Sequence, residues 1–372
     1  MYDIAIIGAG INGCSVAYEF ANSGKKVILF DEQGVAGGGS GAAGAFISPK
    51  FSKAGDLKEL LHDAFVYSLD FYEKNFPSYL TKAPLLHIAQ DEEDSAILKY
   101  YKLNTSFALK TPSNTVLNSL RAEVKMQENL CMDGGVVDAS GVCYAMSKSL
   151  KFVQEKVKTL VEKDAMWVLN EKYLATHVVF ATGAYESILK EPYIKLRGVW
   201  GHRIDIKTTT QNTSSIHQFV SISPSKNGVL AIGATHNVHY HPQLATMPYE
   251  VEEGRLELLE KASRTLKLDN IEILKDYTGL RSGSFDYLPL VGKLVNSEQT
   301  LAQKNGNFKT KNPNYESYAY YPNLYMINGS GGYGFVLAPY LAKMLREFVL
   351  EDKKIDARVN PARFFARWAK KI

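Results

Sequence analysis

The sequence has few cysteines, no long apolar run and only a small excess of one charge. Its three cysteines, Cys14, Cys131 and Cys143, do not show the spacing of metal ligands. The N-terminus has no secretory signal, so we interpret them as reduced thiols in a cytoplasmic protein. No run of about 18 apolar residues is present, which predicts no membrane span. The net charge of +4 permits an anionic partner without requiring one.

The chain begins with the pattern of a dinucleotide-binding unit. Residues 3–8 form a short β-branched run typical of a buried parallel strand, and a helix is predicted up to Ser23. A second strand at 25–33 ends in Asp31 and Glu32. Between the first strand and the helix lie three glycines with GxGxxG spacing: Gly8, Gly10 and Gly13. These glycines allow a tight turn, close approach of a pyrophosphate and close helix–strand packing, while Asp31 can accept ribose hydroxyls. We therefore predict a dinucleotide site here.

Three further segments are rich in glycine and small residues. The segment 34–49 is too apolar for a surface linker and suits a longer ligand that lies extended, which favours FAD over NAD. In 176–187 a strand precedes Ala-Thr-Gly, and in 323–350 a strand meets a glycine-rich turn before a long amphipathic helix. Because a helix N-terminus attracts phosphates and carbonyl oxygens, we expect this second helix to face the same cofactor.

Six blocks of the sequence resemble, in order and spacing, the D-amino-acid oxidase superfamily of FAD enzymes. They are GAGINGC, SGAAGAFI, GGVVDASGV, VVFATGAY, GLRSGSFDYLPLVG and NGSGGYGF. Members of this superfamily include glycine oxidase, sarcosine oxidase and D-amino-acid dehydrogenase. The resemblance covers nearly the whole chain. It implies an α/β fold with a Rossmann-like FAD-binding domain, discontinuous in sequence, and an α+β second domain whose antiparallel sheet covers the substrate.

The order of the blocks predicts how the chain is divided. Three segments are expected to form the FAD-binding domain: 1–79, 134–195 and 270–372. Two segments are expected to form the substrate domain: 80–133 and 196–269. Charged residues at helical spacing predict an exposed amphipathic helix over 250–267. The polar segment 296–322 predicts a long hairpin or loop.

The resemblance also implies which residues contact FAD. They are Gly8, Gly10, Ile11, Asn12, Gly13, Asp31, Glu32, Gly39, Ser40, Ala43, Gly44, Ala45, Val137, Ala181, Thr182, Gly183, Arg281, Gly331, Gly332, Tyr333, Gly334 and Phe335. Some sarcosine oxidases attach their flavin through a cysteine late in the chain, but no cysteine follows Cys143 here. We therefore expect FAD to be bound non-covalently.

Arg281 lies in an apolar, glycine-rich segment, 279–292. A buried guanidinium needs an anionic partner, and no acid lies within four residues of Arg281. Its partner is therefore an internal acid such as Asp286, or an anion that arrives with a ligand. In the superfamily, the arginine of this block holds the substrate carboxylate, which a planar guanidinium can bind through both oxygens. Ser282 departs from the usual proline, a change that concerns backbone shape more than chemistry.

Two other residues are candidates for the catalytic site. His202 lies beside Arg203 on a strand that carries side chains toward the substrate in the superfamily, although a single histidine is more often structural. Tyr333, inside the last glycine-rich turn, can contact the flavin or cover the site. The alternating His236, His239 and His241 are joined by no acid or cysteine, and flavin chemistry needs no metal, so we interpret them as loop residues and expect no metal site.

The substrate is predicted less sharply than the cofactor. Residues 40–72 and the spacing of Arg197, Gly198 and His202 resemble the FAD-dependent half of the bifunctional enzymes that make 5-methylaminomethyl-2-thiouridine in tRNA. This resemblance implies oxidation of the carboxymethylaminomethyl group of a wobble uridine, which releases glyoxylate and leaves aminomethyluridine. Those enzymes carry a methyltransferase half first, whereas this chain begins at the FAD fingerprint, so we expect a stand-alone oxidoreductase.

Two alternatives remain open at this point. One is an oxidase or dehydrogenase of a free small amine such as glycine, sarcosine or a D-amino acid, and the other is a flavin-bearing binding protein without turnover. A tRNA substrate predicts basic surface. The segment 346–372 carries eight Lys and Arg with four acids, and Lys102, Lys110 and the lysines of 304–311 add more. Solvated faces with no partner would show the same composition.

Overall fold

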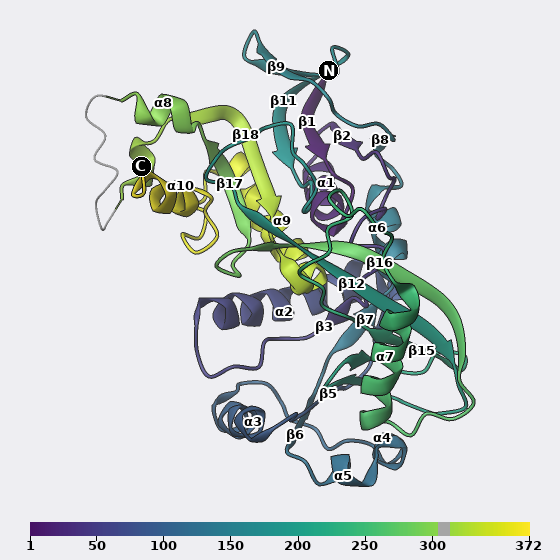
Figure 1. Cartoon of the computed structure of the whole chain (residues 1–372). Coiled ribbons are helices and arrows are strands. Elements are labelled where there is room, and N and C mark those ends of the chain that lie inside the picture. Colours follow the sequence, from purple (N-terminus) through teal and green to yellow (C-terminus); the bar gives the residue numbers. More distant parts are fainter. Residues whose placement is uncertain (304–312) are drawn as a thin grey trace.

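The computed structural model describes residues 1–303 and 313–372, which fold around two large β-sheets (Figure 1). The first sheet has eight strands in the order β17–β18–β11–β1–β2–β8, with β10 and β9 added beside β11. Its strands are β1 (Tyr2–Ile7), β2 (Val27–Phe30), β8 (Lys151–Val153), β9 (Leu160–Lys163), β10 (Met166–Leu169), β11 (Tyr173–Phe180), β17 (Leu290–Val295) and β18 (Tyr320–Asn328). The strands β8, β2, β1, β11 and β18 are mutually parallel, and the other three pair antiparallel.

Both faces of this sheet are buried. Successive side chains of a strand point to opposite faces, so Ile4 and Ile6 of β1 share one cluster with Phe20, while Ala5 and Ile7 join a second cluster. The first face is covered by α1 (Ile11–Asn22) and α9 (Gly334–Glu351), and α6 (Ala139–Ser147) packs against α1 while α2 (Asp56–Asn75) packs against α9. The second face is covered in part by α10 (Ala362–Ala369), through Phe365. Because both faces of the sheet are buried, successive residues of its strands are apolar, which gives the continuous apolar runs seen in the sequence.

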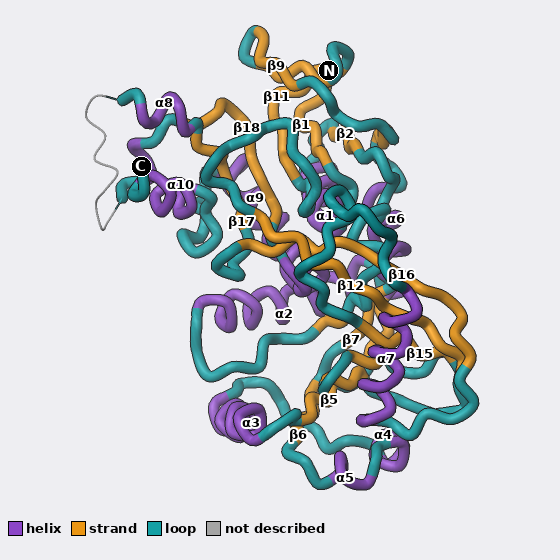
Figure 2. The backbone as a smooth tube through the Cα atoms, in the orientation of Figure 1, coloured by secondary structure: helices purple, strands orange, loops and turns teal. Residues whose placement is uncertain are grey.

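The second sheet has seven strands in the order β16–β12–β15–β14–β13–β5–β6. Their bounds are β5 (Leu85–Ile88), β6 (Asn129–Met132), β12 (Leu196–Lys207), β13 (Ser215–His217), β14 (Ser221–Ile222), β15 (Val229–Gly233) and β16 (Glu272–Ser284). All neighbours pair antiparallel except β13 and β5, which are parallel. One face packs under α7 (Val251–Thr265), where Leu258 and Ala262 meet Ile204 and Ile232. Figure 2 shows the long strands β12 and β16 crossing the middle of the molecule.

Smaller elements complete the described chain. A three-stranded sheet is formed by β3 (Phe46–Ile47), β7 (Gly135–Val137) and β4 (Leu80–Lys82). The other helices are α3 (Glu92–Asn104), α4 (Asn114–Ser119), α5 (Ala122–Lys125), α8 (Ser297–Leu301) and the 3₁₀ turns η1 (Pro77–Tyr79), η2 (Tyr315–Ser317) and η3 (Gly331–Tyr333). In the part of the chain that the structure describes, no helix is long and apolar enough to cross a membrane.

The predicted fold class is confirmed, as are the strand–helix–strand unit at the N-terminus and the helix over 250–267. The division into two domains stays a prediction. The pairing of β16 with β12 places Glu272–Ser284 in the second sheet, whereas the predicted boundaries group it with the first domain. The segment 296–322 was predicted to be a long hairpin or loop. It follows β17 and leads into its antiparallel neighbour β18, and its described ends form α8, η2 and the start of β18. The lysines of 304–311 lie outside the described residues.

Candidate functional site

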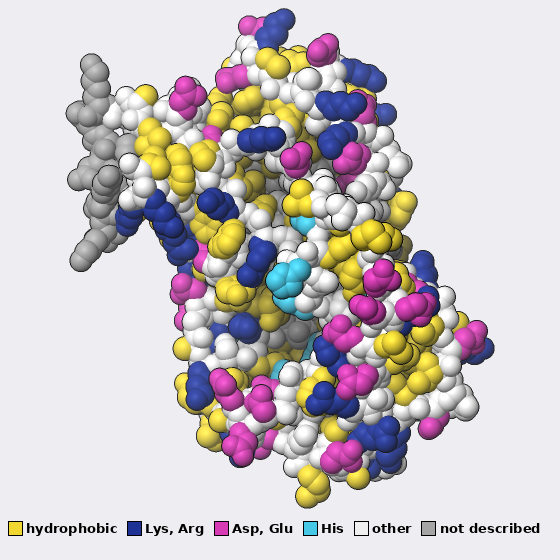
Figure 3. All heavy atoms as spheres, in the orientation of Figure 1, with side chains coloured by type: hydrophobic (Ala, Val, Ile, Leu, Met, Phe, Trp, Pro, Cys, Tyr) yellow, Lys and Arg dark blue, Asp and Glu magenta, His cyan; other side chains and the backbone are white. Residues whose placement is uncertain are grey.

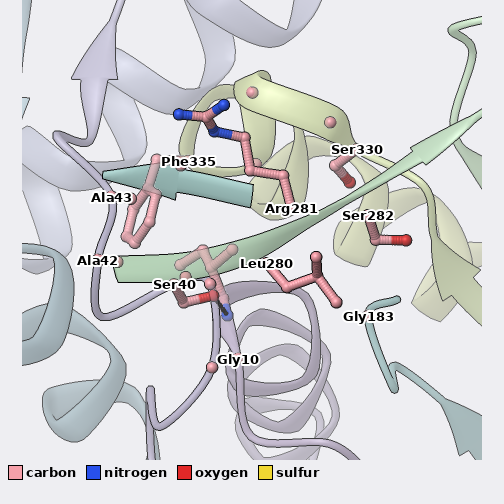
Figure 4. Close-up of a pocket in the computed structure, with 18 of the residues that line it drawn as sticks. Gly10, Ser40, Ala42, Ala43, Gly183, Leu280, Arg281, Ser282, Ser330 and Phe335 are labelled. Carbon is pink, nitrogen blue, oxygen red and sulfur yellow. Dashed lines mark hydrogen bonds between the residues drawn. The ribbon is translucent and has the colours of Figure 1, made fainter. Parts of the chain in front are cut away.

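A cavity of about 670 Å³ lies in the middle of the protein, with walls from both sheets. One part is lined by the turn after β1, by loop residues 38–51 and by the turn that leads into α9. Another part is lined by residues of β5, β12, β13, β15 and β16. Figure 4 shows Gly10, Ser40, Arg281 and Phe335 around this space. In Figure 3 histidine side chains gather around a hollow near the middle of the face shown.

Side chains of Asp31 and Ser40 fix the turn between β1 and α1 through hydrogen bonds to its backbone. The Ala9 amide donates a hydrogen bond of 2.8 Å to the Asp31 carboxylate, and the Ile11 amide donates one of 2.9 Å to the Ser40 hydroxyl. Gly10 precedes α1 without a side-chain cap. The first amides of a helix have no partner within it, so this N-terminus can bind an anionic oxygen. Burial raises the pKa of Asp31, and the amide hydrogen bonds from Ala9 and Gln33 oppose that rise.

The three fingerprint glycines meet different constraints. Gly8 has a φ of +109°, and a Cβ there would lie 2.3 Å from the Ala181 carbonyl oxygen. A Cβ on Gly10 would lie 2.9 Å from the Ser40 hydroxyl, and one on Gly13 would lie 1.8 Å from the Gly8 carbonyl oxygen. Gly13 therefore allows α1 to pack against β1, while Gly10 lines the cavity. These are the roles that GxGxxG spacing predicts.

A second open helix N-terminus faces the same cavity. The turn η3 leads into α9, and Tyr333 precedes α9 without a side-chain cap. Apart from their chain neighbours, no atom of the described residues lies within 4 Å of a Cβ built on Gly331 or Gly332, and both glycines line the cavity. The side chain of Asn328 ties this turn to the loop after β11, because its Nδ2 donates a 2.9 Å hydrogen bond to the Gly183 carbonyl. Two helix N-termini whose N-cap residues provide no side-chain cap lie at one cavity, an arrangement that fits the phosphates and carbonyl oxygens of a flavin dinucleotide.

Arg281 enters the cavity from β16. Its two terminal nitrogens each donate a hydrogen bond of 3.2 Å to the Thr235 carbonyl, and its guanidinium lies over Gly201, where a Cβ would be 2.3 Å from Nη2. Asp286 is not its partner, because both carboxylate oxygens of Asp286 bind Arg363 at 3.0 Å. Burial lowers the pKa of Arg281 below its ordinary value. Among the described residues, Arg281 thus keeps donors free for an anionic ligand.

His202 does not line the cavity. Its ring is fully buried, its Nε2 lies 2.8 Å from the Asp276 carboxylate, and a Cβ on Gly254 of α7 would touch its Nδ1. Adjacent residues of a strand point to opposite faces, so His202 faces α7 while Gly201 faces Arg281. The predicted contact of His202 with substrate is therefore not supported. Arg203 also lies outside the cavity lining and stacks on Tyr277, with its guanidinium carbon 3.8 Å from the ring centroid.

Most predicted cofactor residues line the one cavity, and two do not. Those that line it are Gly8, Gly10, Ile11, Asn12, Asp31, Glu32, Gly39, Ser40, Ala43, Gly44, Ala45, Ala181, Thr182, Gly183, Arg281, Gly331, Gly332, Tyr333, Gly334 and Phe335. Gly13 lies behind the turn, for the packing reason given above. Val137 is buried in the core, and its backbone N–H donates to the carbonyl of Ala45, so its backbone holds a residue that does line the cavity. Contact of these residues with FAD stays a prediction.

Two histidines that line the cavity were not predicted from the sequence. His217 on β13 and His87 on β5 both line it, together with Phe46 and Phe51. A single histidine in a short apolar strand gives no signal of its own, and residues 87 and 217 are brought together only by the pairing of β5 with β13. The loop histidines differ: in the described parts of the chain, no group of three or more His, Cys, Asp or Glu is placed to hold a metal ion.

The basic C-terminal segment is largely neutralised within the fold. Five of its eight cationic side chains contact carboxylates, namely Arg346, Lys353, Arg358, Arg363 and Arg367. Arg363 is buried, and α10 packs against the first sheet through Phe364 and Phe365. The alternative of a solvated face without a partner does not apply to this helix, because its aromatic face is buried in the core. Lys110 likewise pairs with Asp133 at 2.5 Å, and Lys102 pairs with Glu128.

Comparison with known proteins agrees with this geometry. Residues 3–348 match the family described as DAO, FAD dependent oxidoreductase. The tRNA 5-methylaminomethyl-2-thiouridine biosynthesis bifunctional protein MnmC of Campylobacter concisus is 26% identical, over 98% of this chain and 60% of its own length. The protein of the same name from Dichelobacter nodosus is 25% identical, over 98% of this chain and 58% of its own. The chain therefore spans about 60% of the length of such relatives.

Solved structures share the fold at lower identity. Glycine oxidase from Geobacillus kaustophilus superposes with a TM-score of 0.75 at 19% identity, covering 98% of this chain and 97% of that one. Iminodiacetate oxidase from Chelativorans sp. BNC1 gives a TM-score of 0.69 at 16% identity, covering 96% and 98%. Together with the family match over nearly the whole chain, the paired open helix ends and the cavity between the sheets identify the chain as a member of the DAO family of FAD-dependent oxidoreductases, enzymes that act on amino and amine groups.

Proposed function

We propose that this protein oxidises a secondary amine of the N-alkylglycine type, and that its preferred substrate is the carboxymethylaminomethyl group of a wobble uridine in tRNA. The glycine carbon loses a hydride and the nitrogen a proton, which leaves an imine. Water then adds to the imine and cleaves it into glyoxylate and the aminomethyl group. Bound FAD supplies the acceptor for the hydride.

One observation carries this proposal: Arg281 projects into the cavity without a carboxylate partner among the described residues. An N-alkylglycine brings a carboxylate with it. Two N–H groups of the guanidinium donate to the Thr235 carbonyl, and a guanidinium has three further donors with which it can bind a carboxylate through both oxygens. The chain's own residues thus bind and orient the carboxylate end of the substrate.

The tRNA substrate is supported by similarity along the whole chain to proteins named for tRNA modification. A second candidate is a free small amine such as glycine, sarcosine or a D-amino acid. The internal pairing of the C-terminal cations favours this second candidate, because it removes most of the basic surface expected to contact RNA.

We also propose that FAD is held without a covalent bond to cysteine. The three cysteines Cys14, Cys131 and Cys143 are free thiols, all are buried, and none lines the cavity. Burial raises the pKa of Cys131, and for Cys14 a hydrogen bond with Cys143 raises the pKa first and burial adds to it. Denaturation in acid should therefore release all the flavin into the supernatant, and flavin that stays with the precipitated chain would contradict this proposal.

The test is anaerobic bleaching of the visible flavin band. The purified protein is mixed separately with tRNA bearing the carboxymethylaminomethyl group, with the same tRNA lacking it, and with glycine, sarcosine and several D-amino acids. Bleaching by the modified tRNA alone supports the first candidate, and its rate constant should fall with rising salt. Bleaching by a free amine while tRNA stays inert supports the second candidate. If the purified protein contains flavin and none of these compounds bleaches the flavin band, the result supports a flavin-bearing binding protein without turnover.

A further inference from the structure

The second sheet presents a row of in-register residues to the cavity. Strand pairing aligns Gly233 of β15 with Ser221 of β14, Ser221 with His217 of β13, and His217 with His87 of β5. All four line the cavity. Directly opposite residues of paired strands share one face of a sheet, so both histidines project from the same surface as Gly233 and Ser221.

The same surface connects this row with Arg281. The guanidinium lies over Gly201 on β12 and bonds to Thr235, just beyond β15. Between it and His217 the cavity lining includes Gly201, Gly233 and Ser221, and the Arg203 side chain packs over Gly233, where a Cβ would lie 2.8 Å from its Cγ. With about 4.8 Å between neighbouring strands, two to three strand spacings separate the guanidinium from β13, or roughly 10–14 Å. A bound glycine or sarcosine is too short to span this distance, whereas a glycine whose nitrogen carries a ring is not.

His217 has a hydrogen-bonding atom without a partner. Its Nδ1 lies 2.6 Å from the Ser221 hydroxyl, while its Nε2 is buried and makes no hydrogen bond among the described residues. Burial and the neighbouring His87 lower the pKa of His217 to about 3, so the imidazole is neutral near pH 7. A buried polar atom left unpaired is costly, which makes Nε2 a ready site for a ligand hydrogen bond.

Aromatic rings complete the walls. Phe46 meets His217 edge to face with ring centroids 5.1 Å apart, and Phe51 packs on His87 at 4.7 Å. His87 Nε2 lies 3.4 Å from the Asp94 carboxylate, and Lys50 also lines this end. One cation and one carboxylate at the same end give no excess charge. The surroundings therefore suit a flat, uncharged ring with hydrogen-bonding edges better than an anion.

We infer that the end of the cavity formed by His217, His87, Phe46 and Phe51, here called the His217 subsite, binds the ring carried by the amine nitrogen of the substrate, and that this ring is a uracil. The inference rests on the proposed N-alkylglycine chemistry and extends it. Arg281 holds the carboxylate at one end, and the His217 subsite holds the base at the other. His217 is a specificity-determining residue that donates to or accepts from the edge of the base.

The experiment compares two substrates that share the glycine end and differ in the ring: the nucleoside 5-carboxymethylaminomethyluridine and sarcosine. In the holoenzyme, His217→Leu should lower kcat/KM for the nucleoside about tenfold or more, and leave kcat/KM for sarcosine unchanged. His239→Leu makes the same substitution on an exposed residue that does not line the cavity and should leave both values unchanged. An equal change for both substrates, or no change for the nucleoside, would overturn the inference.

A binding measurement separates this inference from the proposed function. Titration calorimetry with uridine, which carries no amine, should detect binding to the holoenzyme and lose it in His217→Leu. If the nucleoside never bleaches the flavin, the proposed function fails, yet uridine binding that depends on His217 still supports the subsite. Absence of uridine binding to the unsubstituted protein overturns it. If His217→Leu does not fold, Ser221→Ala, which removes the hydroxyl beside Nδ1, should weaken uridine binding about threefold, and unchanged binding contradicts the subsite.

Discussion

The Arg281 guanidinium donates two hydrogen bonds of 3.2 Å to the Thr235 carbonyl oxygen. Thr235 is itself fixed by His202, because its hydroxyl accepts from the His202 amide at 2.9 Å and its amide donates to the His202 carbonyl at 3.0 Å. The neutral carbonyl orients the guanidinium without neutralising it. The cation that the proposed chemistry needs is therefore held in place by backbone geometry.

Replacing Arg281 by alanine should lower kcat/KM for carboxylate-bearing amines by about a hundredfold or more, because a buried substrate carboxylate would lose its charged partner. The flavin content should stay normal. Arg121→Ala, at an exposed residue that does not line the cavity, is the matched control and should behave like the unsubstituted protein. Steady-state kinetics of both variants measure kcat/KM, and their visible spectra measure the flavin content. Unchanged kinetics in Arg281→Ala would remove the carboxylate clamp from the proposed function.

Gly201→Ala tests whether the guanidinium must lie flat on β12. The added Cβ would sit 2.3 Å from Nη2, and the flexible arginine would move rather than the strand. We expect a KM for carboxylate-bearing amines raised about tenfold at nearly normal stability. Gly283→Ala is the control on β16, where the nearest atom to a Cβ is the Arg197 carbonyl oxygen at 3.8 Å, an ordinary contact. Equal KM values for the two variants would show that the position of the guanidinium does not matter.

Gly10→Val should abolish FAD retention. The Cβ alone would lie 2.9 Å from the Ser40 hydroxyl, and the branched side chain would fill the space in front of the α1 N-terminus. The ratio of absorbance at the flavin band to that of the protein measures retention, and circular dichroism verifies that the chain is folded. A folded variant that purifies yellow would contradict the predicted dinucleotide site.

Asp286 and Arg363 form a buried ion pair that should stabilise the fold. Burial alone would raise the pKa of Asp286, but the hydrogen bonds and charges of Arg363 and Arg367 hold it below its ordinary value. Asp286→Asn should lower the free energy of unfolding by about 3 kcal/mol at pH 7, because it leaves Arg363 buried without its anion. Urea unfolding measures this difference, with the exposed Asp63→Asn as control.

The difference in the free energy of unfolding between the unsubstituted protein and Asp286→Asn should depend on pH in one direction. A carboxyl whose pKa is lower in the folded than in the unfolded chain contributes stability above its unfolded pKa, about 3.9, and loses it as the pH falls through the folded pKa. The difference between the unsubstituted protein and Asp286→Asn should therefore be constant from pH 7 to about pH 4 and shrink below it. A difference that grows on acidification would rule out a stabilising Asp286 carboxylate.

The dinucleotide-binding unit was predictable because its determinants are local. Gly8, Gly10 and Gly13 act within one turn, and the apolar runs on either side of them specify buried strands without help from the rest of the chain. The helix Val251–Thr265 was predictable for the same reason, since its charged and apolar faces repeat at helical spacing.

The residues of the candidate site were predictable only where one short sequence motif contains all of the residues involved. The sequence by itself determined the glycine-rich cofactor blocks and the choice of Arg281, because these depend on short segments, and its resemblance to the superfamily implied the fold class. Tertiary structure alone decided which face of β12 His202 occupies, that Arg363 rather than Arg281 pairs with Asp286, and that His87 and His217 lie together. Each of these depends on pairing between residues 70 or more positions apart, as in the hydrogen bond between His202 and Asp276 or the ion pair between Asp286 and Arg363, and no local pattern encodes such pairing.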